Sequence, residues 1–219
     1  MPRVTPILRK ARKALQDSDL VKALQSEITH ELSSTPFQDD QSHSPGDFVV
    51  EWDSPQSQDV VLRRNCESGE EVAVSAVLGP VTYGKEGVFP RDVLMKVCLK
   101  KPGLSSMLQF DCGVFEGGNE GSQFDIHNAY YIQSPTCVSP SDYRGPLFSS
   151  LDPQLQDALK EYLVARGVGE SLTNFLLHHL HKREQGQYVN WLKKLESSVA
   201  KINSKLSTMK KPSSKARKI

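Results

Sequence analysis

Apolar and polar residues alternate through the middle third of the chain, with the period of two that is typical of β-strands. The alternation is clearest at residues 72–78 and 93–100. Turn-forming Gly, Pro, Asp and Ser residues separate these runs, and no connection is long enough for the crossover helix that parallel strands need. The pattern predicts an antiparallel meander with strands at 48–52, 59–63, 72–78, 93–100, 107–115 and 124–133.

After Pro140 the apolar residues recur with the period of an α-helix. Asp152 is the predicted N-cap of the first helix, and Pro153 suits the first helical position because that residue needs no N–H partner. Gly167 is predicted to end this helix. Two further apolar faces predict helices around 172–180 and 188–202. The sheet is therefore followed by two or three C-terminal helices, which makes the fold class α+β.

Another helical pattern precedes the strands, at residues 19–32. Its apolar residues form one narrow stripe, Leu20, Leu24, Ile28 and Leu32. So narrow a stripe suits a seam against one other helix better than a place in a broad core. A polar linker at 33–46 joins this helix to the first predicted strand.

Charge is distributed unevenly along the chain. Residues 1–16 carry five basic residues and no acid, and residues 201–219 carry seven basic residues and no acid. The remaining 17–200 hold 15 basic and 26 acidic residues, a net charge of −11. The amphipathic, acid-free N-terminal segment is typical of a mitochondrial presequence, with a basic surface arm as the alternative. The Lys-, Ser- and Pro-rich tail at 207–219 is predicted to be disordered.

The acidic body creates a field that favours cationic partners such as basic protein segments or the chain's own tail. At any one loop, clustered carboxylates are also what a solvated surface presents. The basic tail provides an alternative function, nucleic-acid binding or a nuclear address. The candidate acidic partner-binding residues are Glu67, Glu70, Glu71, Asp111, Glu116, Glu120 and Asp125, and the candidate nucleic-acid residues are Lys210, Lys211, Lys215, Arg217 and Lys218.

No motif predicts catalysis, a cofactor, a metal or a small-molecule substrate. Gly79 to Lys85 resembles the start of a phosphate-binding loop, but Glu86 replaces the required Ser or Thr. The histidines at 178, 179 and 181 share a helix without a completing set of ligands, and His127 has no nucleophile elbow near it. Tyr130, Tyr131 and Phe124 could stack bases on a sheet face, but no basic residues are interleaved with them in the sequence.

Compartment is indicated by the cysteines and by the lack of long apolar runs. Cys66, Cys98, Cys112 and Cys137 form no Cys-x-x-Cys pair, and the chain has no N-glycosylation sequon. No apolar run approaches the roughly 18 residues of a membrane span. We expect a soluble protein in a reducing intracellular compartment.

The C-terminal third resembles the mitochondrial glycoprotein family, the acidic matrix proteins that include the animal protein binding the globular heads of complement. Two stretches, Leu-Asp…Tyr-Leu…Arg-Gly-Val and Tyr-x-x-Trp-Leu-x-x-Leu, are together fairly specific. The residues that carry the resemblance are Leu151, Asp152, Pro153, Leu155, Ala158, Tyr162, Leu163, Arg166, Gly167 and Val168, then 171–176, then Tyr188, Val189, Trp191, Leu192, Lys193 and Leu195.

The resemblance implies a twisted antiparallel sheet of about seven strands, the seventh most consistent with residues 136–143, flanked by one N-terminal and two or three C-terminal helices. It also implies that the N-terminal helix pairs with the last helix through Leu192, Leu195 and Val199, and that three copies form a ring-shaped homotrimer. One domain at 17–206 would lie between the basic segment 1–16 and the tail 207–219.

The function implied by the resemblance is a non-catalytic, multi-ligand scaffold or chaperone-like protein of the mitochondrial matrix that supports mitochondrial gene expression or respiratory function. Its expected partners are further copies of itself and basic protein segments, with RNA at the tails as the alternative. The nucleus or cytosol is the alternative compartment, because the basic tail extends past the usual end of the family pattern.

Overall fold

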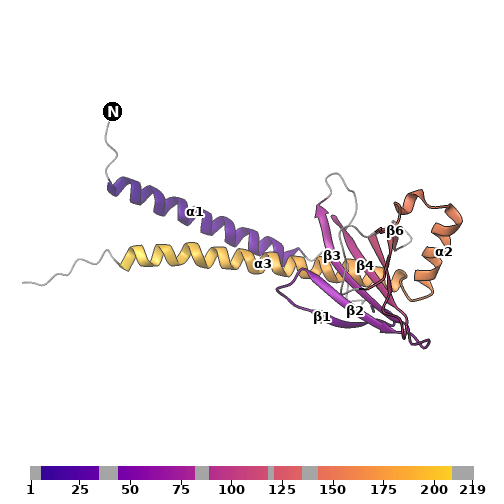
Figure 1. Cartoon of the computed structure of the whole chain (residues 1–219). Helices are drawn as coiled ribbons and strands as arrows, with labels where there is room; N and C mark the ends of the chain where they lie inside the picture. The colour runs from indigo at the N-terminus through magenta and orange to yellow at the C-terminus, as the bar shows by residue number, and fades with distance from the viewer. Residues whose placement is uncertain (1–5, 35–43, 82–88, 118–120, 135–142, 209–219) are drawn as a thin grey trace, which may run out of the picture. The chain divides into compact units, whose positions relative to one another are not determined.

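The computed structural model describes residues 6–34, 44–81, 89–117, 121–134 and 143–208, with side chains described only from 17 to 200 of these. The chain divides into two compact units. The sheet unit is Pro36–Glu184, and the helical unit combines Met1–Thr35 with Gln185–Ile219. The long last helix contributes its first residues to the sheet unit and the rest to the helical unit (Figure 1).

The sheet unit contains a six-stranded sheet whose strands follow one another in chain order. Every neighbouring pair is antiparallel, so the predicted meander is confirmed. The seventh strand expected at 136–143 falls almost entirely outside the described residues. The strands are β1 (Val49–Asp53), β2 (Asp59–Asn65), β3 (Glu71–Val81), β4 (Arg91–Lys100), β5 (Met107–Glu116) and β6 (Ser122–Ile132).

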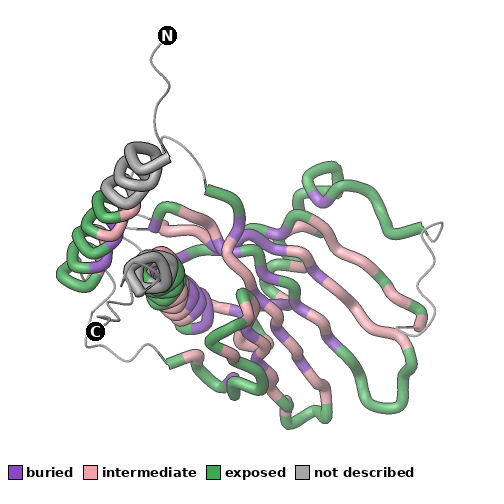
Figure 2. The backbone as a smooth tube through the Cα atoms, turned by 90° about the vertical axis from the view of Figure 1, so that its left-hand side faces the viewer, coloured by how far each residue is buried: buried purple, intermediate pink, exposed green. Residues whose placement is uncertain are grey.

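One face of the sheet forms the core of this unit. Alternate side chains along β2 to β6 are fully buried, as the alternating sequence pattern requires, and Figure 2 shows this alternation along the strands. Leu163 of α2 (Pro153–Val164), Phe148 of the short helix η2 (Phe148–Ser150) and the first turns of α3 (Glu170–Thr208) belong to the same core cluster. On the opposite face, which we call the open face, Ser75 and Asp111 are half-buried and Lys96 is exposed.

The boundaries of α2 follow the predicted capping residues. The Asp152 side chain accepts a hydrogen bond from the Gln154 backbone N–H at 2.9 Å, and Pro153 occupies the first helical position. After the helix, Gly167 adopts φ +87°, a conformation that side chains with a Cβ rarely take. The Val168 N–H then reaches back to the Leu163 carbonyl at 3.1 Å and closes the helix end.

The two helices predicted at 172–180 and 188–202 are one continuous helix, α3, so two C-terminal helices follow the sheet. Gly186 is the single glycine between the two predicted segments, and no proline lies there. A lone glycine costs a helix only about 1 kcal/mol relative to alanine, which the flanking turns outweigh. The first helix, α1, spans Pro6–Ser33 and therefore begins well before the predicted residue 19. No helix in the described ranges has the length and apolar character needed to cross a membrane.

Candidate partner-binding surfaces

Glu67, Glu70 and Glu71 lie at the turn between β2 and β3, but only Glu67 is fully exposed. Glu71 is ion-paired with Arg63, which also contacts Glu51 at 2.9 Å. These pairs neutralise much of the charge that the sequence places at this turn. A cavity of about 680 Å³ opens beside it, lined by Asp47, Arg64, Asn65, Cys66, Glu67, Ser68, Glu70, Ala165 and Arg166.

Glu70 is held inside the unit by Arg166. The guanidinium donates to the two carboxylate oxygens at 2.9 and 3.1 Å, and both side chains are largely shielded from solvent. Lys101 is more distant, at 3.8 Å. The hydrogen bond from Arg166 keeps the pKa of Glu70 below its ordinary value, since it outweighs the opposing effect of burial. Glu70 therefore serves first as the partner of Arg166.

The second predicted acidic group lies toward the other end of the sheet, because the register pairs Glu116 with Ser122 there. Asp125 is exposed and 3.6 Å from Lys160, a weak pair. Asp111 lies in the middle of the open face and accepts a hydrogen bond from the Gln109 amide at 3.1 Å. Glu116 is half-buried, and Glu120 lies outside the described residues.

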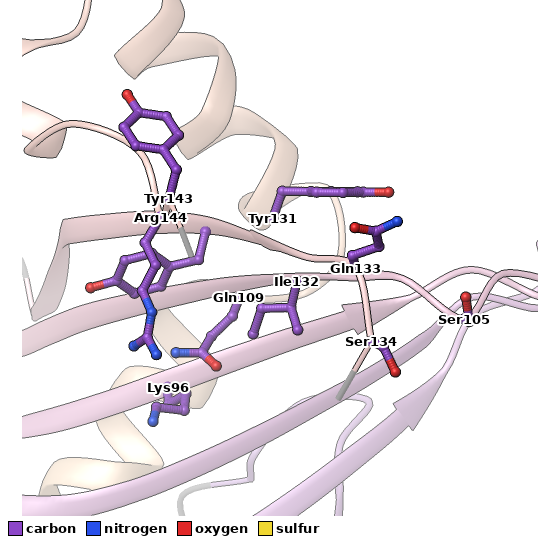
Figure 3. Close-up of a pocket in the computed structure, with 10 residues that line it drawn as sticks. Lys96, Ser105, Gln109, Tyr131, Ile132, Gln133, Ser134, Tyr143 and Arg144 are labelled. Atoms are coloured by element: carbon purple, nitrogen blue, oxygen red, sulfur yellow. The ribbon is translucent and has the colours of Figure 1, made fainter. Parts of the chain in front are cut away.

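The open face holds a cavity of about 740 Å³, to which β4, β5 and β6 all contribute lining residues. We call it the open-face cavity. Tyr130 and Gln109 are opposite one another across β5 and β6, and a bulge at His127 sets this register. Figure 3 shows Lys96, Gln109 and the Arg144 guanidinium on one side, with the Tyr131 ring apart from them. The lining residues are Lys96, Ser105, Gln109, Tyr130, Tyr131, Ile132, Gln133, Ser134, Tyr143 and Arg144.

In the helical unit, α1 packs on the second half of α3 through a small apolar cluster of Leu24, Ile28 and Leu192, with Leu195 beside them. Gln25 donates a hydrogen bond to Glu196 at 2.8 Å next to this cluster. Of the other predicted seam residues, Val199 is half-buried, while Leu20 and Leu32 are 48% and 58% exposed.

The end of α1 is also tied to α3 by polar contacts. The Gln185 amide donates to the Glu31 and Ser34 carbonyls at 3.2 and 2.9 Å, which satisfies carbonyl groups that a helix end leaves without partners. Tyr188 donates to Glu27 at 3.2 Å. These contacts fix where α1 ends against α3.

Two histidines of α3 make polar contacts within the sheet unit. His179 lies 2.9 Å from Asp53 of β1, which Arg183 also contacts at 2.6 Å. His181 is buried, and its Nδ1 lies 2.8 Å from the Leu177 carbonyl oxygen. Among the described residues, no group of three possible ligands could hold a metal ion.

The remaining sequence candidates lie mostly outside the described residues. The first three residues of the phosphate-loop-like motif, 79–81, belong to β3, whereas the residues that follow, at 82–88, are not described. The same holds for the tail at 209–219, which includes all five candidate nucleic-acid residues.

The three described cysteines differ in the environment of their thiols. Burial raises the pKa of the Cys112 thiol to about 12 and also raises the pKa of Cys98. Because the thiolate is the nucleophile, we expect Cys112 to react with iodoacetamide at least about a hundredfold more slowly than half-exposed Cys66 at pH near 8. Site-resolved mass spectrometry of the native protein measures both rates. Equal rates would contradict the buried environment of Cys112.

A family model described as mitochondrial glycoprotein matches residues 90–199, half of the chain, from the start of β4 into α3. The matched range includes the residues on which the resemblance was based. The chain belongs to the mitochondrial glycoprotein family. This is a family of mitochondrial acidic proteins that are generally non-catalytic binding proteins.

Two relatives of this chain are named as mitochondrial proteins. The mitochondrial acidic protein mam33 of Schizosaccharomyces pombe is 31% identical over 122 residues, which are 49% of this chain and 43% of that protein. An uncharacterised mitochondrial protein of Arabidopsis thaliana is 26% identical over 198 residues, 82% of this chain and 74% of that protein. The match thus spans less than half the length of the S. pombe relative.

Solved structures share the fold of this mitochondrial glycoprotein family chain. The p22 protein of Trypanosoma brucei superposes with a TM-score of 0.66 at 22% identity, covering 84% of this chain and 99% of that one. A Leishmania major protein, described as a sequence homologue of human p32 protein, gives 0.63 at 20% identity over the same shares. At these identities the likeness concerns the fold alone.

Proposed function

We propose that the protein is a non-catalytic scaffold of the mitochondrial matrix that captures basic protein segments and works as a ring-shaped homotrimer. The observation that carries the proposal is the separation of charge between the two units. The sheet unit has 21 acidic and 12 basic residues, whereas the helical unit has 5 acidic and 15 basic residues. A body of net charge −9 attracts cationic segments over several ångströms.

The surface acids differ in how much they can contribute to such binding. Glu70 and Glu71 are ion-paired within the unit, so a partner would have to displace an arginine to reach them. Glu67 is exposed, and the one ion pair of Asp125 within the described ranges is with Lys160, at 3.6 Å. We therefore assign the capture of basic segments chiefly to Glu67 and Asp125. The net negative charge of the whole sheet unit adds a longer-range attraction.

Charge reversal at these two residues tests the proposal. We expect Glu67→Lys with Asp125→Lys to weaken binding of a fluorescent Lys/Arg-rich peptide about tenfold, since each exposed charge contributes up to about 1 kcal/mol. Anisotropy at low and at physiological salt measures it, and binding should weaken as salt screens the charges. The matched control reverses Asp17 and Asp19 of α1 and so changes the net charge equally. Equal loss in both double variants would contradict a site on the sheet unit.

The trimer is tested separately by light scattering. Three copies of a 24.4 kDa chain give about 73 kDa. A stable mass of one chain in dilute buffer would contradict the ring.

A second candidate function, nucleic-acid binding through the tail, is favoured by five cations and no acid within residues 207–219. Deleting this segment decides between the two. Loss of RNA binding with retained peptide binding would assign the nucleic-acid function to the tail.

A further inference from the structure

The helical unit brings the two acid-free segments of the chain to the same end. Gln25 of α1 donates to Glu196 of α3, whereas the Glu31 carbonyl, further along α1, accepts from Gln185, earlier in α3. The two helices are therefore antiparallel. Residues before Gln25 run in the same direction as residues after Glu196, and Figure 1 shows the first turns of α1 and the last turns of α3 at one end of the unit.

Six basic residues belong to the helical part of this end. Helix α1 runs without interruption from Pro6 to Ser33, so its acid-free first turns are continuous with the part that packs on α3. Residues 6–16 hold four basic residues and residues 201–208 hold two, with no acid in either range. We call them the helical cations: Arg9, Lys10, Arg12, Lys13, Lys201 and Lys205.

The register of the two helices places these residues near the start of the basic tail. Gln25 and Glu196 lie at one level, because their side chains are hydrogen-bonded. At 1.5 Å per residue, Lys13 is about 18 Å from Gln25 along the axis, and residue 208 is about 18 Å from Glu196. Lys13 is therefore level with the end of α3. Like charges from two helices and the tail accumulate there, which favours an anionic partner.

A seven-residue apolar repeat runs along each helix. Its positions are Ile7, Ala14, Val21 and Ile28 in α1, with Leu192, Val199 and Leu206 in α3. Ile28 and Leu192 share the apolar cluster between the helices, and repeats of this period are typical of paired helices. None of the helical cations falls on either repeat. Helix pairing thus accounts for the apolar residues that binding to a membrane surface would need.

We propose that the helical cations form a binding site for a single-stranded nucleic acid, whose phosphates contact both helices and continue onto the basic tail. A linear polyanion fits this arrangement better than a single small anion, because the cations come from three separate segments. Lysine and arginine neutralise phosphates without reading the bases, so the site binds without sequence preference. The proposal rests on the second candidate function and adds a second set of cations to it.

Binding of a fluorescein-labelled single-stranded RNA of about twelve nucleotides to the full chain tests the proposal. We expect Lys10→Gln with Lys13→Gln to weaken binding more than about tenfold at about 0.1 M salt, because each phosphate contact contributes a factor of about five there. Lys201→Gln with Lys205→Gln should weaken binding by a similar factor. Glutamine forms helices about as well as lysine, so circular dichroism should be unchanged.

The matched control is Lys193→Gln with Lys194→Gln. It removes the same charge from the same unit, and both lysines are exposed. Each lies about 10 Å or more from Lys201 along α3. That separation reaches the Debye length at about 0.1 M salt, so we expect the control to weaken RNA binding less than about threefold.

Salt dependence separates the helical cations from the tail. Six contacts to a single strand predict a slope of about −4 in log affinity against log salt, and five tail contacts add about −3.5. A protein lacking 207–219 should therefore keep RNA binding with the smaller slope. Combining this deletion with the two helical double variants should abolish binding.

Four results would overturn the proposal. The first is equal binding by the Lys10/Lys13 variant and the control. The second is complete loss of RNA binding when the tail alone is deleted, which would leave the nucleic-acid function to the tail. The third is binding of phosphatidylglycerol vesicles without binding of RNA, which would assign the cations to a membrane surface. The fourth is an intact mass showing that the protein isolated from its own cells begins after Lys13.

These results leave the other proposals separately testable. The tail function survives the second result and fails only if the intact chain binds no RNA. The capture of basic peptides is measured with the Glu67 and Asp125 variants of the sheet unit, which none of these substitutions alters.

Discussion

Replacing Leu192 with alanine is expected to separate α1 from the second half of α3. Leu192 is 3% exposed and, among the residues whose side chains are described, shares its cluster with two other buried residues, Leu24 and Ile28. A buried Leu→Ala change costs about 2–5 kcal/mol, which is a large share of the stability that so small a cluster supplies. Hydrogen exchange measured by mass spectrometry should show faster exchange across 17–33 by more than about tenfold, since 1.4 kcal/mol is a factor of ten.

The strands of the sheet unit provide the internal reference for this experiment, because their core does not include Leu192. Leu20→Ala is the matched control, as Leu20 belongs to the same predicted stripe but is 48% exposed. We expect it to change exchange by less than about threefold. Unchanged protection of α1 in Leu192→Ala would show that the apolar cluster does not hold the helices together.

The stripe on α1 shows how far spacing alone predicts a contact. Leu20, Leu24, Ile28 and Leu32 are four residues apart, and the inner two are buried while the outer two are exposed. An α-helix advances about 100° per residue, so each step of four rotates the side chain by about 40°. Over the whole stripe the rotation reaches about 120°, more than one partner helix can cover. Periodicity thus identified the seam but not its length.

The strands were predictable because each depends on local alternation and on turn residues. Residues 93–100 were predicted as a strand, and β4 spans Arg91–Lys100. The sequence predicts two helices where α3 is one, because each half of α3 has its own apolar face. The sequence between them has no proline, and its one possible end signal, Gly186, lies inside the continuous helix.

The open-face cavity could not be predicted from the sequence. It depends on the register of three strands, in which Lys96 is opposite Asp111 and Gln109 is opposite Tyr130. The bulge at His127 shifts this register by one residue, and such a slip moves a side chain to the other face. Arg144 reaches the cavity from outside the strands altogether. The ion pair of Glu70 with Arg166, 96 residues apart, was missed for the same reason.

Replacing Arg166 with methionine is expected to destabilise the sheet unit by about 3 kcal/mol, because it removes the close cationic partner of the shielded Glu70 carboxylate and leaves Lys101 at 3.8 Å and the Ser68 hydroxyl at 3.5 Å. The change also removes a hydrogen bond of 3.0 Å to the Tyr162 carbonyl and the stacking of the guanidinium on the Tyr162 ring, 3.4 Å from its centroid. Urea unfolding at neutral pH measures the loss. The double variant with Glu70→Gln should recover much of it, since a neutral amide tolerates the site better than an unpaired charge.

The pH dependence of stability provides the second readout of this pair. Arg166 lowers the pKa of Glu70 in the folded state, so the pair stabilises the protein above the ordinary glutamate range. That contribution disappears as the pH falls through the lowered pKa and the carboxylate becomes protonated. Stability of the unaltered protein should therefore fall on acidification more steeply than that of Glu70→Gln. If the two single variants lose stability additively and with the same pH dependence, Glu70 and Arg166 do not act as a pair, and Glu70 is available to a basic partner.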